Sequence, residues 1–329
     1  MKTFFKVVGI ILLVVVALAA IGISWLALRK PAQRDAVAEK IEATPERIAR
    51  GEYLAHHVSI CTDCHSERTD QYALPFKPGR EGVGGFIWDE KMDFPGTLPA
   101  ANLTPDPETG LGKWTDGEIL RAIREGVNRE GKALFPIMPY SHLRHMSDED
   151  AKSIVAYLRT IPPQRYEEPK KSLKVPMNFI EKFIPKPVEG TVTAPDRSDH
   201  LAYGKYMTTI ALCSECHATK DDKNQPIAGR EFAGGWEMVT PTFRVVPPNI
   251  TPHPTTYMGQ ATKEEFIARF RSFANFTPAN TPAAPKGKNT LMPWISYSGM
   301  TDEDLGAIYD YLKTLPPVEH KVNPFPDAG

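Results

Sequence analysis

The sequence predicts an all-α protein in which one N-terminal transmembrane helix precedes two helical domains in tandem. Three observations favour this fold class: a long uncharged apolar stretch near the N-terminus, an internal repeat of roughly 150 residues, and apolar residues that recur at helical spacing. The chain has 31 prolines among its 329 residues, which favours short helices joined by structured loops over a sheet-rich fold.

The apolar stretch covers residues 7–28 and has Ser24 as its one clearly polar side chain. A helix that rises ~1.5 Å per residue can cross a bilayer core of ~30 Å over this length. The stretch ends in Trp25 and Arg29, an aromatic residue typical of the membrane interface followed by a charged stop. We therefore expect an uncleaved membrane anchor over residues 1–30.

A cleaved signal peptide is the alternative interpretation of this N-terminus. Lys2 and Lys6 would be its basic start, and Ala17-Leu-Ala19 would be a small-residue cleavage site. The apolar run continues well beyond Ala19, which favours the anchor. The following residues, 31–43, are polar and charged without a sustained apolar stripe, so we expect them to form a tether.

One cysteine motif occurs twice, as Cys61-Thr-Asp-Cys64-His65 and as Cys213-Ser-Glu-Cys216-His217, and the two copies use all four cysteines of the chain. Cysteines at this spacing lie on one side of a helical turn, where both thiols can add to the vinyl groups of one porphyrin. The histidine that follows lies beneath the iron as its proximal ligand. The sequence therefore predicts two covalently bound haem c groups with His65 and His217 as iron ligands.

A four-cysteine zinc site and a thioredoxin-like dithiol are the alternatives for these motifs. The ligand pairs of such zinc sites usually lie much closer together in the sequence, and zinc gives no reason for a histidine after both pairs. A redox dithiol would require a strand-to-helix setting, which neither copy has. Both alternatives are disfavoured.

The repeat extends far beyond the cysteines. The matched stretches are Gly79-Arg80-Glu81 with Gly229-Arg230-Glu231, Asn102-Leu-Thr-Pro105 with Asn249-Ile-Thr-Pro252, Thr115-Asp-Gly-Glu118 with Thr262-Lys-Glu-Glu265, and Ser147-Asp-Glu-Asp150 with Thr301-Asp-Glu-Asp304. The last two pairs are helix starts with Ser or Thr at the N-cap. We expect one domain at 44–166, a proline-rich linker at 167–196, a second domain at 197–320 and a tail at 321–329.

The order of these features resembles the class I cytochrome c fold: an N-terminal helix, Cys-x-x-Cys-His, a methionine in a loop, and a final helix that contains Tyr-Leu and packs on the first. The Asn-Leu-Thr-Pro stretch followed by residues 109–115 resembles, more narrowly, the membrane-anchored multi-haem cytochrome c subunits of bacterial alcohol, gluconate and sugar dehydrogenases. The resemblance covers both repeats, about four fifths of the chain. Many such subunits have three haem units, and Ala261 stands where the first repeat has Trp114.

Each repeat offers two methionines in register as the sixth iron ligand, Met138 with Met292 and Met146 with Met300. Met146 and Met300 directly precede helix N-caps, where an apolar residue usually serves as a hydrophobic staple. Met138 and Met292 lie in a loop that a following proline keeps extended. Class I cytochromes c have their ligand at this place, so we predict Met138 and Met292 as the axial ligands.

Histidine is the alternative sixth ligand in the first repeat. His142 and His145 lie close to the loop methionine, but neither recurs in the second repeat. His56 and His57 also have no counterpart, and we expect them on a helix surface near the haem edge.

Matched polar residues are candidates for binding the haem propionates. Arg80 and Arg230 recur beside glycines, and a guanidinium binds a carboxylate bidentately. Asn102 and Asn249 are candidate donors to the same carboxylates. Turn residues and solvated charge are the alternative interpretation of all four.

These features predict an electron-transfer protein and not an enzyme, because iron with His and Met ligands has no open position for a substrate. The resemblance implies a membrane or periplasmic dehydrogenase as electron donor and a cytochrome, quinone or oxidase of the respiratory chain as acceptor. Haem c is attached on the outer face of the bacterial inner membrane, so we expect a single-pass protein with its haem domains in the periplasm. The near-neutral charge gives no hint of nucleic-acid binding.

Three other classes remain open. A di-haem peroxidase needs one five-coordinate iron, which the matched methionines disfavour. The di-haem subunit of a cbb3-type oxidase has a similar anchor and two haems. A haem-based sensor is the least favoured, since no signalling segment follows the second repeat.

Overall fold

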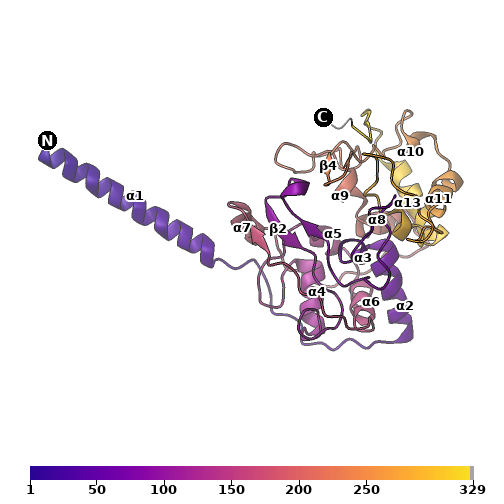
Figure 1. Cartoon of the computed structure of the whole chain (residues 1–329), viewed down its shortest axis with the longest axis horizontal. Coiled ribbons are helices and arrows are strands. Elements are labelled where there is room, and N and C mark those ends of the chain that lie inside the picture. Colours follow the sequence, from indigo (N-terminus) through magenta and orange to yellow (C-terminus); the bar gives the residue numbers. More distant parts are fainter. Residues whose placement is uncertain (327–329) are drawn as a thin grey trace.

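The computed structural model describes residues 1–326, and these are mostly helical. Figure 1 shows a long N-terminal helix, α1 (Lys2–Leu28), that projects from a body containing the remaining elements. None of the residues of α1 is buried, and the helix is long and apolar enough to cross a membrane. The last part of the predicted tail, 327–329, lies outside the described residues.

The body consists of two halves that follow the two repeats, with a short connecting segment between them. The first half contains α2 (Pro45–Tyr53), the π-helix η1 (Leu54–Val58), α3 (Cys61–Cys64), β1 (Ile87–Trp88), the 3-10 helix η2 (Glu90–Met92), β2 (Gly96–Pro99), α4 (Asp116–Glu125), α5 (Tyr140–Leu143) and α6 (Asp148–Leu158). The connecting segment contains β3 (Ser172–Leu173), α7 (Met177–Ile180) and the 3-10 helix η3 (Glu181–Phe183). The second half contains α8 (His200–Ile210), α9 (Cys213–His217), β4 (Met238–Val239), β5 (Arg244–Val245), α10 (Tyr257–Gln260), α11 (Lys263–Arg271), α12 (Trp294–Tyr297) and α13 (Asp302–Thr314).

The predicted helix starts are confirmed. α4 and α11 each begin with a complete capping box, in which Thr115 or Thr262 and the glutamate three residues later exchange hydrogen bonds with the backbone. Ser147 and Thr301 cap α6 and α13. Each of these side chains satisfies a backbone N–H that the first helical turn leaves without a partner.

Within each half the first helix packs on the last, α2 on α6 and α8 on α13, as the resemblance implied. A glycine lies at each crossing. A Cβ added to Gly51 would lie 1.8 Å from the Ser153 carbonyl oxygen, and one added to Gly204 would lie 2.1 Å from that of Ala307. The two backbones are in direct contact at both crossings, which is possible only because glycine has no side chain.

The connecting segment lies on the first half. β3 pairs antiparallel with β2 in a three-stranded sheet of order β1-β2-β3. Further along, the Val192 carbonyl accepts a hydrogen bond from the Asp148 backbone N–H, at 2.8 Å, and the Pro187 carbonyl accepts one from Arg144, at 2.8 Å. The predicted linker is therefore attached to the first half over much of its length.

The segment that follows α1, predicted as a tether, is irregular but bound to the same half. Arg34 forms an ion pair of 2.8 Å with Glu125, which is buried. The Gln33 amide donates to the Gly131 carbonyl at 3.2 Å, and Ile41 is part of the core. These contacts connect the end of α1 to the body by a short, fixed path.

The two halves share one hydrophobic core and a reciprocal set of hydrogen bonds. In each half a tyrosine hydroxyl donates to an aspartate at the start of the other half's last helix and accepts a hydrogen bond from the N-cap backbone N–H of that helix. The two sets are Tyr53 with Asp304 (2.6 Å) and Thr301 (3.1 Å), and Tyr206 with Asp150 (2.5 Å) and Ser147 (3.1 Å). Since these residues match in the repeat, the halves are related by an approximate two-fold axis.

Candidate haem-binding sites

Each cysteine motif begins directly after a residue in the left-handed conformation. Ile60 has φ 45° and precedes α3, while Leu212 has φ 61° and precedes α9. This conformation is unfavourable for a residue with a side chain and most unfavourable for a β-branched one. Its recurrence at the matched position indicates that the turn into the motif requires it in both halves.

The four cysteines are free thiols, and none pairs with another. Burial raises the pKa of Cys61 to about 12 and that of Cys64 to about 11, and it raises the pKa of Cys213 and Cys216 to about 12. Reactive dithiols need the opposite, a lowered thiol pKa. Within residues 1–326, no three His, Cys, Asp or Glu side chains converge on a common metal position. The raised thiol pKa values therefore disfavour the dithiol alternative.

The histidines of the motifs are held by matched backbone carbonyls. His65 Nδ1 lies 2.7 Å from the Ala101 oxygen, and His217 Nδ1 lies 2.7 Å from the Pro248 oxygen. A carbonyl only accepts, so each Nδ1 donates and each Nε2 keeps its lone pair. Burial lowers the pKa of both imidazoles, although the bond to the carbonyl opposes this shift. Neutral imidazoles oriented in this way are suited to bind iron through Nε2.

The matched asparagines lie directly after these two carbonyls. The Asn102 amide donates to the Gln164 carbonyl at 2.7 Å and to Thr109 Oγ1 at 3.2 Å. The Asn249 amide donates to the carbonyls of Val318 at 2.8 Å and His320 at 3.3 Å. Both side chains thus connect the loop that orients the histidine to the chain beyond the last helix. Their binding of propionates stays a prediction, and a propionate would have to replace one of these bonds.

The two matched arginines have different surroundings. Arg80 donates to Glu67 Oε1 through Nε at 2.9 Å and Nη2 at 2.7 Å, and its guanidinium lies over the Tyr166 ring. At the position equivalent to Glu67 the second half has Thr219, so Arg230 lacks this carboxylate. Propionate binding by either arginine stays a prediction.

The four methionines divide as their places in the repeat suggest. Met146 and Met300 are 0% and 1% exposed and belong to the core, which agrees with a staple role. Met138 and Met292 are half-buried at its edge. Each has its carbonyl bound by the N–H two residues later, at 2.8 Å in the first half and 2.7 Å in the second. Met138 and Met292 are therefore available as ligands, and iron ligation by these two residues stays a prediction.

The loop after each methionine contacts the other half's cysteine motif. His142 Nε2 lies 3.1 Å from Ser214 Oγ, inside the second motif. At the equivalent position of the second half, Ser296 Oγ donates to Asp63, inside the first motif. Sequence reasoning missed this cross-contact, although the pairing of His142 with Ser296 in the repeat marked the place.

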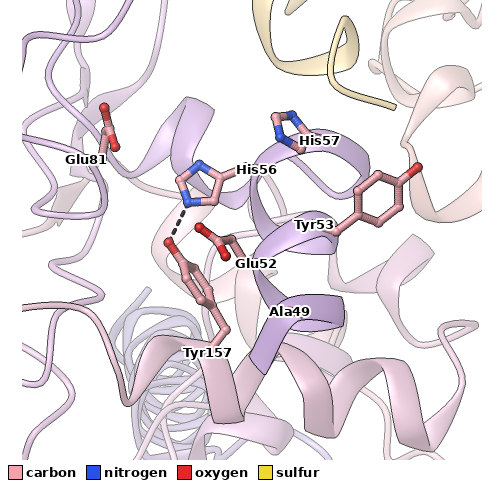
Figure 2. Close-up of a pocket in the computed structure, with 7 residues that line it drawn as sticks. All are labelled: Ala49, Glu52, Tyr53, His56, His57, Glu81 and Tyr157. Carbon is pink, nitrogen blue, oxygen red and sulfur yellow. Dashed lines mark hydrogen bonds between the residues drawn. The ribbon is translucent and has the colours of Figure 1, made fainter. Parts of the chain in front are cut away.

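His56 and His57 lie on the surface of a helix, η1, as expected. Both line an open surface pocket (Figure 2). His56 Nε2 and the Tyr157 hydroxyl share a hydrogen bond of 2.5 Å, and burial lowers the pKa of this imidazole. His57 Nδ1 donates to the Ser296 carbonyl at 2.8 Å. Both rings are therefore hydrogen-bonded within the protein.

The cytochrome c family matches residues 201–316, which run from α8 to the end of α13. This segment is a cytochrome c domain. It contains the second cysteine motif, Met292 and the pair of crossing helices, so the predicted haem chemistry has a family basis in this half. The cytochrome c domain and the first half share the local geometry described above.

The chain is also similar along most of its length to cytochrome subunits of dehydrogenases. It is 28% identical over 295 residues to the cytochrome c subunit of alcohol dehydrogenase (quinone) from Gluconacetobacter polyoxogenes, which covers 86% of this chain and 59% of the relative. It is 27% identical over 297 residues to the fructose dehydrogenase cytochrome subunit of Gluconobacter japonicus, covering 85% of this chain and 56% of the relative. A diheme cytochrome c-type protein of Cereibacter sphaeroides is 26% identical over 307 residues, with 91% of this chain and 95% of the relative covered. The resemblance to dehydrogenase cytochrome c subunits is confirmed, and the chain spans less than two thirds of the length of the two dehydrogenase subunits.

Proposed function

We propose that this chain is a di-haem electron-transfer protein with two tandem class I cytochrome c domains. One haem c would be attached to Cys61 and Cys64, and the second to Cys213 and Cys216. The observation that carries the proposal is the repetition of one local geometry: a left-handed residue before the motif and a histidine held through Nδ1 by a backbone carbonyl. The family match covers residues 201–316, in the second half. Because the first half has the same motif and local geometry, the match supports the same chemistry there.

Bound haem c would supply reversible one-electron chemistry at its iron. The chain's own residues would then bind, orient and insulate it. His65 and His217 offer a neutral Nε2, and Met138 and Met292 would occupy the opposite positions. With both axial positions filled by side chains, neither site would be open to a substrate, which favours electron transfer over a peroxidase activity.

Electrons would pass between the two halves within one molecule. The cysteine motifs lie on the shared interface, where His142 meets Ser214 and Ser296 meets Asp63. The reciprocal tyrosine bonds and the common core keep the halves at one relative position. A fixed spacing between the two sites would follow from this packing.

The names of the relatives support a dehydrogenase as electron donor. A cytochrome, quinone or oxidase of the respiratory chain would be the acceptor. We place the body on the periplasmic side of the bacterial inner membrane, with α1 as a single-pass anchor, because haem c attachment requires the outer face. Subunit membership in a terminal oxidase is the competing assignment.

The number of haems can be measured directly. Intact mass of the denatured chain, together with haem staining of a denaturing gel, should show two covalent haems. The pair of variants C61A/C64A and C213A/C216A should each retain one. If the chain with all four cysteines carried only one haem, the proposal would be limited to a single site.

The anchor is tested by the mature N-terminus and by alkaline carbonate extraction of membranes. We expect the chain to begin upstream of α1's apolar core and to stay in the membrane pellet. A mature N-terminus at Ala20 or Ile21 would identify a signal peptide instead.

A further inference from the structure

The connecting segment carries three exposed apolar side chains on and around α7 and η3. Val175 is 73% exposed, Ile180 44% and Phe183 46%. Exposed apolar residues this large and this close together are unusual on a soluble surface and commonly mark a contact site. We call these three residues with the lysines around them the connecting-segment face.

The connecting-segment face lies against the end of α1. The ring centroids of Phe183 and Trp25 are 6.3 Å apart, and the Arg29 guanidinium lies over both rings, 4.3 Å from the centre of Phe183 and 5.0 Å from that of Trp25. Lys182 Nζ donates to the carbonyls of Leu26 and Ala27 at 3.0 and 2.7 Å. Figure 1 shows α7 at the edge of the body beside the end of α1.

Positive charge predominates on this face. Its lysines are Lys170, Lys171, Lys174, Lys182 and Lys186. Between residues 170 and 186 the single acidic side chain is Glu181, which is buried and paired with Lys171 at 2.5 Å. Glu90 of η2 also reaches this face and pairs with Lys174 at 2.5 Å. The face therefore combines exposed apolar groups with a net positive charge, which suits the boundary between anionic headgroups and acyl chains.

The position of α1 decides between a lipid and a protein occupant. Trp25 and Arg29 end the apolar helix, and residues of these types lie at headgroup level when a helix crosses a bilayer. Phe183 contacts both of them, so it lies at the same level. A face at this depth meets lipid before it meets any soluble partner.

We propose that the connecting-segment face is a second membrane contact, in which Val175, Ile180 and Phe183 enter the headgroup region and the exposed Lys170 and Lys186 bind lipid phosphates. It rests on the membrane anchoring by α1 proposed above. The body would then be held at two points, α1 and the connecting-segment face. Its sheet side would face the bilayer, and the second half would remain exposed to redox partners.

Spin labels on the full-length chain in lipid nanodiscs test this contact. The variant I180C reports from the face, and L201C is the matched control, since Leu201 is an apolar residue of α8 that is 50% exposed. In the proposed function the four native cysteines bind haem, so the unmodified chain should take up no label. We expect the ratio of collision rates with oxygen and with an aqueous nickel chelate to be several-fold higher at 180 than at 201.

The size of the difference should also depend on lipid charge. In nanodiscs that contain phosphatidylglycerol the oxygen-to-nickel ratio at 180 should exceed its value in nanodiscs of phosphatidylcholine alone, while the ratio at 201 should be the same in both. Equal ratios at 180 and 201 in both lipids would overturn the second contact. A label at 180 that is immobilised without a higher oxygen ratio would indicate a protein contact instead, which also overturns it.

The outcomes separate this proposal from those it rests on. Labelling of the unmodified chain would count against haem attachment, and loss of the chain from carbonate-washed membranes would count against the anchor. A chain that stays in the membrane but has a water-exposed label at 180 overturns the second contact alone. If α1 is cleaved, the labels are read with the chain added to phosphatidylglycerol vesicles, and equal ratios at 180 and 201 again overturn it.

Discussion

Ala101 and Pro248 contribute nothing but backbone oxygens, and yet these oxygens determine which nitrogen of each motif histidine is free. The cysteines and histidines themselves could be predicted as haem-binding residues from the sequence, because covalent attachment requires those residue types at that spacing. The carbonyls could not, since any residue has one. The matched Asn102 and Asn249 that follow them are the available signal, although their residue type alone suggests propionate donors.

Replacing Met138 or Met292 by alanine should remove half of the methionine-sulfur-to-iron charge-transfer band of the oxidised protein, lower that site's potential and open its iron to small ligands. Met146 and Met300 are the controls. Their replacement by alanine should leave the band in place but lower the free energy of unfolding by about 2–5 kcal/mol, because it creates a cavity in the core. Absorption spectra and urea unfolding measure both. Loss of the band in M146A or M300A would show that these residues are the ligands and that Met138 and Met292 are the staples.

Glu168 should make stability depend on pH. Burial raises the pKa of its carboxyl to about 7, and Oε1 has no hydrogen-bond partner among the described residues. The pKa is higher in the folded chain, so the carboxyl costs stability progressively as the pH rises from about 4.5, its usual pKa, to about 7. Since the group is partly exposed, we expect E168Q to gain about 1–2 kcal/mol at pH 8 and little at pH 4.5. E167Q, at the exposed neighbour, should change little at either pH in urea unfolding; a pH-independent gain in E168Q would contradict the assignment.

At the scale of elements, the sequence determines the helices more clearly than the strands. Capping boxes and N-caps are local patterns, so α4, α6, α11 and α13 could be located from the sequence. The sheet β1-β2-β3 could not, because β3 comes from the connecting segment and pairs with a strand far earlier in the chain. Strands of two to four residues show no alternation that a sequence pattern can detect.

The helix crossings predict a large effect for a small change. G51A and G204A each place a methyl group within about 2 Å of a backbone carbonyl of the partner helix, so the helices must separate, and we expect a loss of about 3 kcal/mol in the free energy of unfolding. G306A is the matched control in α13. Its Cβ would have Lys263 Cδ as its nearest neighbour at 3.5 Å, and alanine favours the helix by up to about 1 kcal/mol. Urea unfolding should therefore show a lower free energy of unfolding for G51A and G204A, and an equal or higher one for G306A.

At the scale of the whole molecule, the sequence showed two copies of a unit but not how they meet. Tyr53, Tyr206, Asp150 and Asp304 were all visible as matched residues. A repeat register cannot tell whether such residues bond within one copy or between copies, because both arrangements give the same pattern. The relative placement of the two halves therefore needed the structure.

Removing the reciprocal tyrosine–aspartate hydrogen bonds should make the unfolding of the two halves less cooperative. Y53F leaves one oxygen of the fully buried Asp304 without this donor, and Y206F does the same at Asp150, so each should cost about 1–3 kcal/mol. The double variant should split a single calorimetric transition into two. Y309F is the control, since Tyr309 bonds to the Ala261 carbonyl within one half. A single, unsplit transition in the double variant would show that the shared core suffices.

The exchange of identical bonds between the halves is the arrangement of an isologous dimer whose two subunits have been joined end to end. Each half carries both the tyrosine and the aspartate, so each is complementary to a copy of itself. A substitution in such a chain alters only one of two equivalent positions, which no true homodimer permits. The packing of the halves can therefore stay symmetric while positions such as His142 and Ser296 diverge. The two proposed haem sites can then acquire different properties without any change in the way the halves are held together.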